Sequence, residues 1–282
     1  MNATGEFRFV EQLGKDLSDG VVSLPSLPDV VIRIRTLLEQ EECDFDRVSQ
    51  AVRMDPALVS RLMAFANSAF LSRGGDPVRS LDVAIGRLGF EVIRNAALSL
   101  AVKQLFLSEQ HHAIAAHLKK IWSRSIQLAS MSLVIAKRQG GLNEETAFMC
   151  GLLHEIGKLY ILTKAKDFPE FLSDNESLEI VLDEWHSQIG ESIVEVWGFD
   201  EEVCRSVVAY DHLVERAHSA PTMLDVVYVA RLLVDKSDDA SMDWSAIASC
   251  NKLAVTNETI PEILGLYEEK HRSVRQSLSQ AG

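Results

Sequence analysis

The chain has 282 residues, 47% hydrophobic and 24% charged, so it can bury one large core or two small ones. Its 41 acidic and 28 basic residues give a net charge of −13, which opposes binding to nucleic acid and anionic membranes. No apolar run approaches the ~20 residues of a membrane span. The four cysteines lack metal or disulfide-framework spacing, so we expect a cytoplasmic protein.

Apolar residues recur with helical period along nearly the whole chain, whereas long alternating strand patterns are absent. The pattern therefore predicts an all-α fold. In the first half, Asp55-Pro56 and Ser80 are start signals, and Gly89 should divide one long apolar stretch into two helices. The helices predicted there cover residues 28–40, 45–52, 56–70, 81–88 and 90–106.

The helix–Gly–helix segment around Gly89 also allows a helix-turn-helix interpretation, in which the recognition helix runs from Glu91 onward and Arg87 and Arg94, seven residues apart, lie on one side. Residues 53–103 hold seven Arg or Lys against four Asp or Glu, unlike the rest of the chain. The alternative is a helical hairpin with a solvated basic rim. The apolar face around Ile93 and the negative net charge of the whole chain favour this alternative, so we expect no nucleic-acid partner.

In the second half, Gly140-Gly141 should end one long helix, and Asn143 should cap the helix that carries His154 and Glu155. The helices predicted there cover residues 113–138, 143–163, 186–197, 200–212, 221–236, 244–253 and 260–278. We predict an N-terminal helical subdomain (1–110), a second helical subdomain (111–239) and a C-terminal helical tail (240–282).

Several polar residues interrupt the apolar helices of the second subdomain. They are Arg124, His154, Glu155, Lys158, His186, Asp211, His212 and Arg231. They come from five predicted helices, and a helical bundle could bring them together at its centre. Such a cluster is a metal site, a ligand contact or a satisfied core network, because an unpartnered buried polar group costs about 1–3 kcal/mol. Lys158 by itself is typical of a helix-end residue whose ammonium reaches solvent.

A series of motifs resembles the HDOD family, the HD-related output domains of bacterial signalling. The motifs are, in order, LPSLPDV, DPALVSRLMAFANSAF, SLDVAIGRLGFEVIRNAAL, IWSRS, GLLHEIGKL, HSQIGESIVEVWGF and VVAYDHL. The resemblance runs from about Leu24 to Asp235. It implies an N-terminal helical bundle packed on a degenerate bundle of the HD phosphohydrolase type.

The chain departs from active HD enzymes at most of the positions that the resemblance assigns to metal ligands. The segment Ser123-Arg124-Ser125 stands where their first histidine falls, and Ala230-Arg231 replaces a closing Ala-Asp. The His-Asp pair becomes His154-Glu155, the His-His pair of cyclic di-GMP-degrading relatives becomes Asp211-His212, and His186 matches a later histidine. The GYP signature of those relatives is absent after His212.

These replacements put fixed positive charge at an ancestral cation site, since arginine stays protonated in proteins. At ~4 Å and an effective dielectric constant near 20, each guanidinium repels a unit positive charge by about 4 kcal/mol. Glu155 and Asp211 could pair with Arg124 and Arg231. We therefore expect salt bridges in place of the metal, and no cofactor.

The sequence thus predicts a non-catalytic, cytoplasmic signal-transduction module that binds a protein partner or a small ligand and does not bind a membrane. One alternative is a metal-dependent phosphohydrolase whose metal ligands are His154, Glu155, His186 and His212. Another is a cyclic-nucleotide or nucleotide sensor in which Arg124, Lys158 and Arg231 clamp phosphates.

Overall fold

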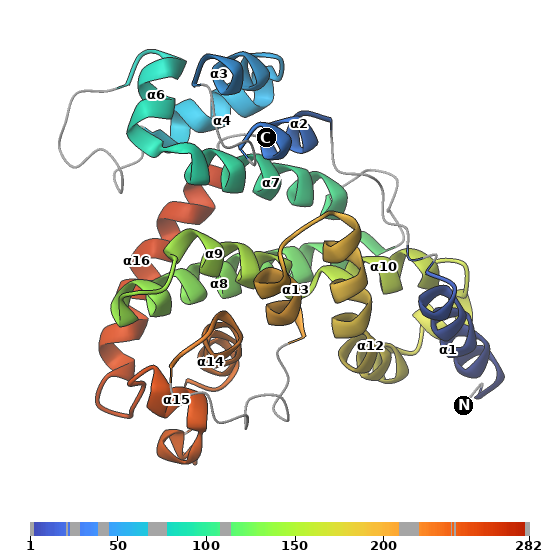
Figure 1. Ribbon diagram of the computed structural model, residues 1–282. Coiled ribbons are helices and arrows are strands. Elements are labelled where there is room, and N and C mark those ends of the chain that lie inside the picture. The colour runs from blue at the N-terminus through green and yellow to red at the C-terminus, as the bar shows by residue number, and fades with distance from the viewer. Residues whose placement is uncertain are drawn as a thin grey trace. The chain divides into compact units, whose positions relative to one another are not determined.

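The computed structural model describes residues 3–20, 22, 29–38, 45–66, 78–107, 114–208, 220–237, 239 and 241–279 (Figure 1). In these ranges every regular element is helical, which confirms the predicted all-α class. None of the described helices is long and apolar enough to cross a membrane. In chain order the elements are α1 (Ala3–Ser18), α2 (Asp29–Leu38), α3 (Phe45–Arg53), α4 (Pro56–Ala66), α6 (Leu81–Leu88), α7 (Phe90–Phe106), α8 (Ala115–Gln139), α9 (Glu144–Leu153), α10 (Ile156–Ala165), α11 (Pro169–Leu172), α12 (Asn175–Val196), α13 (Glu201–Val207), α14 (Met223–Lys236), the 3-10 turn η3 (Trp244–Ala246), α15 (Ala248–Lys252) and α16 (Ile260–Ser279).

Contacts divide the chain into two compact units. The large unit is Met1–Ser26 with Phe106–Leu264, and the small unit is Leu27–Leu105 with Gly265–Gly282. This grouping differs from the predicted boundaries 1–110, 111–239 and 240–282 at both ends of the chain. Helix α1, which the sequence argument did not identify, packs against α11 and α12, and α15 packs against α14.

The small unit contains α2, α3, α4, α6, α7 up to Leu105, and α16 from Gly265 onward. Ser80 caps α6 by accepting a hydrogen bond from the Val83 N–H at 3.3 Å, and Gly89 ends it with φ of 78°, as predicted. The Arg53 guanidinium donates to both carboxylate oxygens of Asp82 at 2.9 Å, and Arg94 pairs with Glu91. These pairs reduce the positive charge available to a phosphate backbone. The absence of a nucleic-acid partner stays a prediction.

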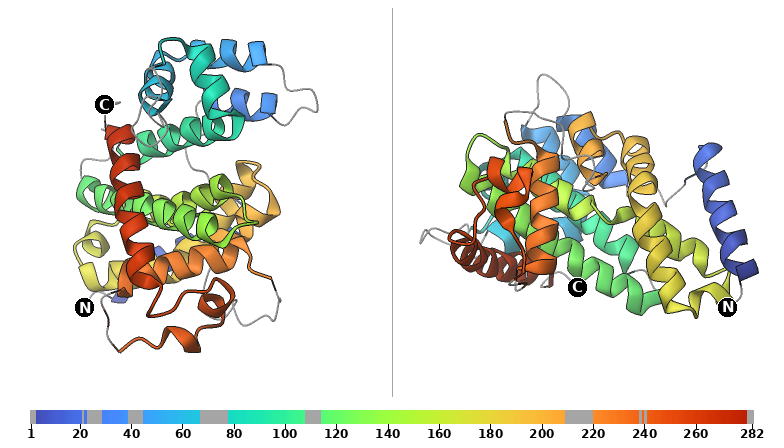
Figure 2. Two further views of the ribbon diagram at one scale, coloured as in Figure 1. Left: turned by 90° about the vertical axis from the view of Figure 1, so that its left-hand side faces the viewer. Right: turned by 90° about the horizontal axis from the view of Figure 1, so that it is seen from below.

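The large unit is built around α8, a helix of 25 residues that packs against α9, α10 and α14 (Figure 2). Gly140 ends α8 with φ of 69°, and the Asn143 side chain caps α9 by accepting from two backbone N–H groups at 2.9 and 3.0 Å. Gly151 allows α9 to approach α8 closely, because a Cβ there would lie 2.6 Å from the Leu128 carbonyl oxygen. Both predicted helix ends are confirmed.

Three predicted helices differ clearly from the structure. The helix expected over residues 244–253 is divided at Ile247 into η3 and α15. The helix expected to carry His154 and Glu155 is broken at that pair, since α9 ends at Leu153 and α10 begins at Ile156. Helix α12 begins at Asn175 rather than near His186, because Asp174 caps it by accepting from the Ser177 N–H at 3.3 Å. The break places two polar side chains at a junction between helices, where the cavity described next is found.

Candidate functional site

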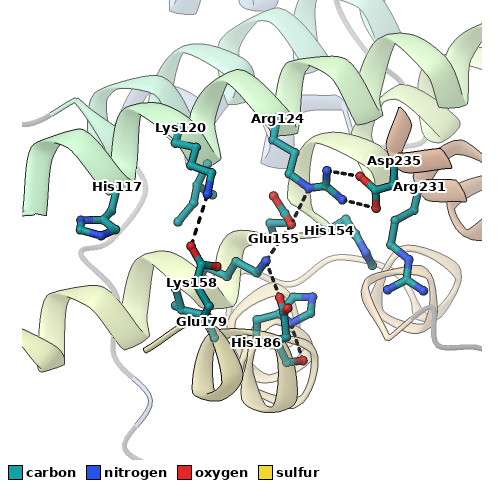
Figure 3. Close-up of a pocket in the computed structure, with 13 residues that line it drawn as sticks. His117, Lys120, Arg124, His154, Glu155, Lys158, Glu179, His186, Arg231 and Asp235 are labelled. Carbon is teal, nitrogen blue, oxygen red and sulfur yellow. Dashed lines mark hydrogen bonds and ion pairs between the residues drawn. The ribbon is translucent and has the colours of Figure 1, made fainter. Parts of the chain in front are cut away.

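A cavity of about 360 Å³ lies within the large unit, among α8, the α9–α10 junction, α12 and α14 (Figure 3). Its wall is formed by His117, Lys120, Ile121, Arg124, His154, Glu155, Lys158, Glu179, Leu182, Asp183, His186, Arg231 and Asp235. Six of the eight predicted site residues therefore line one cavity. The other two, Asp211 and His212, lie outside the described residues.

Glu155 is the centre of the ion pairs in this wall. Its Oε1 atom accepts from Arg124 Nε at 2.9 Å and from Lys158 Nζ at 2.9 Å, and the side chain is only 3% exposed. Burial alone would raise the pKa of Glu155, but the nearby Lys158 and Arg124 outweigh burial and hold that pKa below its usual value. Glu155 is therefore an anion held by two permanent cations.

Arg124 joins α8 to two other parts of the wall. Besides Glu155, it binds Asp235 on α14 through both terminal nitrogens, with the Nη2–Oδ2 distance at 2.8 Å (Figure 3). The expected pair of Arg124 with Glu155 is present, whereas the expected partner of Arg231, Asp211, is outside the described part of the chain. Asp235 was missed, although it lies one helical turn after Arg231 and so on the same face of α14.

Lys158 is a structural cation. The prediction that its ammonium reaches solvent is wrong. The residue is 8% exposed, and its Nζ atom lies 2.9 Å from both Glu155 Oε1 and Asp183 Oδ1. Burial lowers a lysine pKa, but here Glu155 and Asp183 outweigh burial and raise the pKa of Lys158. Asp183 was also missed. Its position three residues before His186 on the same helix was the available signal.

His154 and His186 meet edge to face, with ring centroids 5.7 Å apart, and are 2% and 4% exposed. His186 Nδ1 lies 3.1 Å from the Asp183 carbonyl oxygen, which favours the tautomer with hydrogen on Nδ1. Burial, and then the charge of Lys158, lowers the pKa of His186 to about 4. Burial, His186 and Arg231 lower the pKa of His154 well below its ordinary value. Both rings are therefore neutral at pH 7.

The two buried histidines should make the fold sensitive to mild acid. Because their folded pKa values lie below the ordinary value of about 6.5, protons bind the unfolded chain first as pH falls. For His186, stability should fall from about pH 6.5 to about pH 4, by up to ~1.4 kcal/mol per pH unit. NMR titration of the His186 ring protons should give a midpoint near 4, and urea unfolding at pH 7 and 5 should show the loss. A midpoint near 6.5 would contradict the neutral buried pair.

The donors that the structure describes in the wall do not form a site for a divalent ion. Across the described ranges, no three His, Cys, Asp or Glu side chains are grouped so that they could hold one. The Glu155 oxygen that faces Arg124 and Lys158 is already shared by two cations, and these would repel a further positive charge. Two polar atoms at the junction, His154 Nδ1 and Glu155 Oε2, are buried without a hydrogen-bond partner within the described part of the chain.

Comparison with known proteins places this geometry in a family. A solved structure from Shewanella amazonensis SB2B, described as a candidate metal-dependent phosphohydrolase, has a TM-score of 0.80 and 25% identity over 97% of this chain and 99% of that one. An HDOD domain protein of unknown function from Geobacter sulfurreducens has a TM-score of 0.69 and 20% identity over 96% and 97%. An uncharacterised protein of Treponema pallidum (strain Nichols) is 23% identical over 238 residues, 79% of this chain and 44% of that protein.

The chain thus spans less than half the length of the Treponema relative. The HDOD domain profile matches residues 24–213, which include the cavity-lining segments of α8, α10 and α12. Because this match covers more than half of the sequence, the chain belongs to the HDOD domain family.

Proposed function

We propose that this chain is a non-catalytic signal-transduction module, whose cavity is held by ion pairs where HD enzymes hold metal. The observation that carries the proposal is the shared Glu155 oxygen, bound at 2.9 Å by both Arg124 and Lys158. A metal phosphohydrolase needs a carboxylate and imidazoles that are available to its ion and an activated water. Here one oxygen of the carboxylate next to His154, Oε1, is committed to two protein cations, and these would repel a metal ion that approached the other oxygen.

The charge balance of the cavity disfavours a phosphorylated ligand. Four Lys or Arg side chains line the wall (Lys120, Arg124, Lys158 and Arg231), and so do four Asp or Glu side chains (Glu155, Glu179, Asp183 and Asp235). A phosphate would have to displace carboxylates from Arg124 and Lys158 before it could use them. The cavity volume of about 360 Å³ falls at the low end of small-ligand sites, so a compact polar ligand is the second candidate.

Elemental analysis and hydrolysis assays test this proposal together. We expect the purified chain to carry far less than one equivalent of Mn, Fe or Mg. With added Mn²⁺, its turnover of bis(p-nitrophenyl) phosphate and cyclic dinucleotides should equal that of the His154→Ala variant. Calorimetry with the same cyclic dinucleotides should give no saturable heat. Stoichiometric metal, or turnover that His154→Ala abolishes, would show that the chain is a hydrolase, and saturable heat would favour the nucleotide sensor.

A further inference from the structure

Helix α1 precedes the matched residues 24–213 and belongs to the large unit, where it lies beside α12 (Figure 2). Phe9 and Leu13, one turn apart, are fully buried. The Phe9 ring centroid lies 5.3 Å from that of Phe168 and 4.6 Å from that of Phe171. By contrast, Phe7 is 70% exposed, so α1 buries one stripe and leaves the other side open.

The buried stripe of α1 also carries a carboxylate. Asp16 is 6% exposed, and its Oδ2 atom accepts from Tyr160 Oη at 2.5 Å and lies 3.1 Å from Lys164 Nζ. Its Oδ1 atom accepts from Gln12 Nε2 at 2.7 Å. Apolar contacts have no direction, whereas a buried carboxylate with several donors is satisfied in one position only. Asp16 therefore fixes the register of α1 on α10.

The residues that receive α1 are neighbours of the cavity wall in the sequence. Tyr160 follows Lys158 by two positions on α10. Trp185, whose ring would lie 3.7 Å from a Cβ at Gly14, stands between Asp183 and His186 on α12. Helix α1 thus contacts α10 through Asp16 and packs against α12, the two helices that the 2.9 Å Lys158–Asp183 ion pair joins.

We propose that Tyr160, Lys164, Phe168, Phe171 and Trp185 form a helix-docking groove, and that its occupant α1 is a releasable strap whose seating stabilises the Lys158–Asp183 ion pair in the cavity wall. The proposal rests on the proposed function and names a regulation of the same site. An isolated helix of this length is marginal in water, so undocking and unfolding of α1 are one event. A partner that takes the groove needs an amphipathic helix with the spacing Phe-x₃-Leu-x₂-Asp.

Hydrogen exchange of the full chain, read by mass spectrometry, tests the strap. In Asp16→Asn, amides of α1 should exchange about tenfold faster, because a hydrogen-bonded buried charge is lost. Amides near Lys158 on α10 and near Asp183 on α12 should also speed up, while α14 should not change. Lys164→Met should give the same pattern. Glu11→Gln, on the exposed side of α1, should exchange like the wild type.

Rescue in trans tests the groove. A synthetic peptide of residues 1–20, added at ~1 mM to match a tethered segment, should slow exchange of α10 and α12 in the Asp16→Asn chain, and a Leu13→Ala peptide should not. Faster exchange confined to α1, faster exchange that includes α14, or no rescue would each overturn the proposal. Metal-dependent turnover would overturn the proposed function while leaving this exchange pattern in place.

Discussion

Replacing Gly157 with alanine should destabilise the large unit by about 3 kcal/mol or more, at the upper end of the cost of overpacking. A Cβ at Gly157 would lie 2.0 Å from the carbonyl oxygen of His186 and 2.9 Å from the backbone nitrogen of Gly190. Both neighbours are backbone atoms of α12, so no side chain can move aside, and α10 would have to separate from α12. The midpoint of urea unfolding measures the loss.

A matched glycine separates this effect from helix propensity. Gly265 also lies inside a helix, α16, but nothing is found within 4 Å of a Cβ placed there. Gly265→Ala should therefore stabilise the chain by ~0.5–1 kcal/mol, the usual gain when a helical glycine becomes alanine. If Gly157→Ala behaved in the same way, the close crossing of α10 and α12 at His186 would be wrong, and with it the position of Lys158 beside Asp183.

The helix ends that the sequence predicted well are those with local signals. Ser80 and Asn143 cap α6 and α9 by accepting hydrogen bonds from backbone N–H groups two or three residues later. The glycines at 89 and 140 adopt positive φ values that end α6 and α8. Such signals depend on a few neighbouring residues. The all-α class followed for the same reason, because helical periodicity can be read within a short window.

The break at His154 and Glu155 could not be predicted in this way. No proline, capping residue or positive-φ glycine marks it, and the apolar run continues on both sides. The break coincides with tertiary contacts: the Glu155 side chain reaches Arg124, and Gly157 lies against α12. Helix propensity is weak compared with such packing, so tertiary contacts decide where α9 ends.

The resemblance to HD enzymes identified most of the polar residues that line the cavity, but not Asp183 and Asp235, which pair with Lys158 and Arg124. Arg124, His154, Lys158 and His186 were identified because they interrupt apolar helices or occupy family positions. Asp235 was not, since it is 111 residues from Arg124 and reads as a surface residue at the end of α14. No spacing rule connects two helices so far apart in the sequence, and only the folded chain shows which carboxylate receives the guanidinium.

Removing the guanidinium with Arg124→Met should cost about 3 kcal/mol at pH 7, the low end of the loss when one partner of a buried ion pair is deleted. The Glu155 side chain, 3% exposed, would keep only Lys158, and Asp235 would lose its forked contact. Arg205→Met is the control, because Arg205 and Glu201 are 72% and 77% exposed and should lose less than ~0.5 kcal/mol. Urea unfolding measures both.

The pH dependence of this loss identifies its cause. In the wild type, burial raises the pKa of Glu155, but Lys158 and Arg124 outweigh burial and lower that pKa below its ordinary value of 4.5. Ionised Glu155 therefore stabilises the fold above pH 4.5, and this contribution is lost as the pH falls through the lowered pKa. In Arg124→Met the pKa of Glu155 should rise, because only the Lys158 ammonium then opposes the effect of burial. The difference in unfolding free energy between the two proteins should therefore shrink between pH 7 and pH 4, and Arg124→Met with Glu155→Gln should lose less than the sum of the single changes. A constant difference across that range would mean that Arg124 acts through packing, and that positive charge does not hold the carboxylate beside His154.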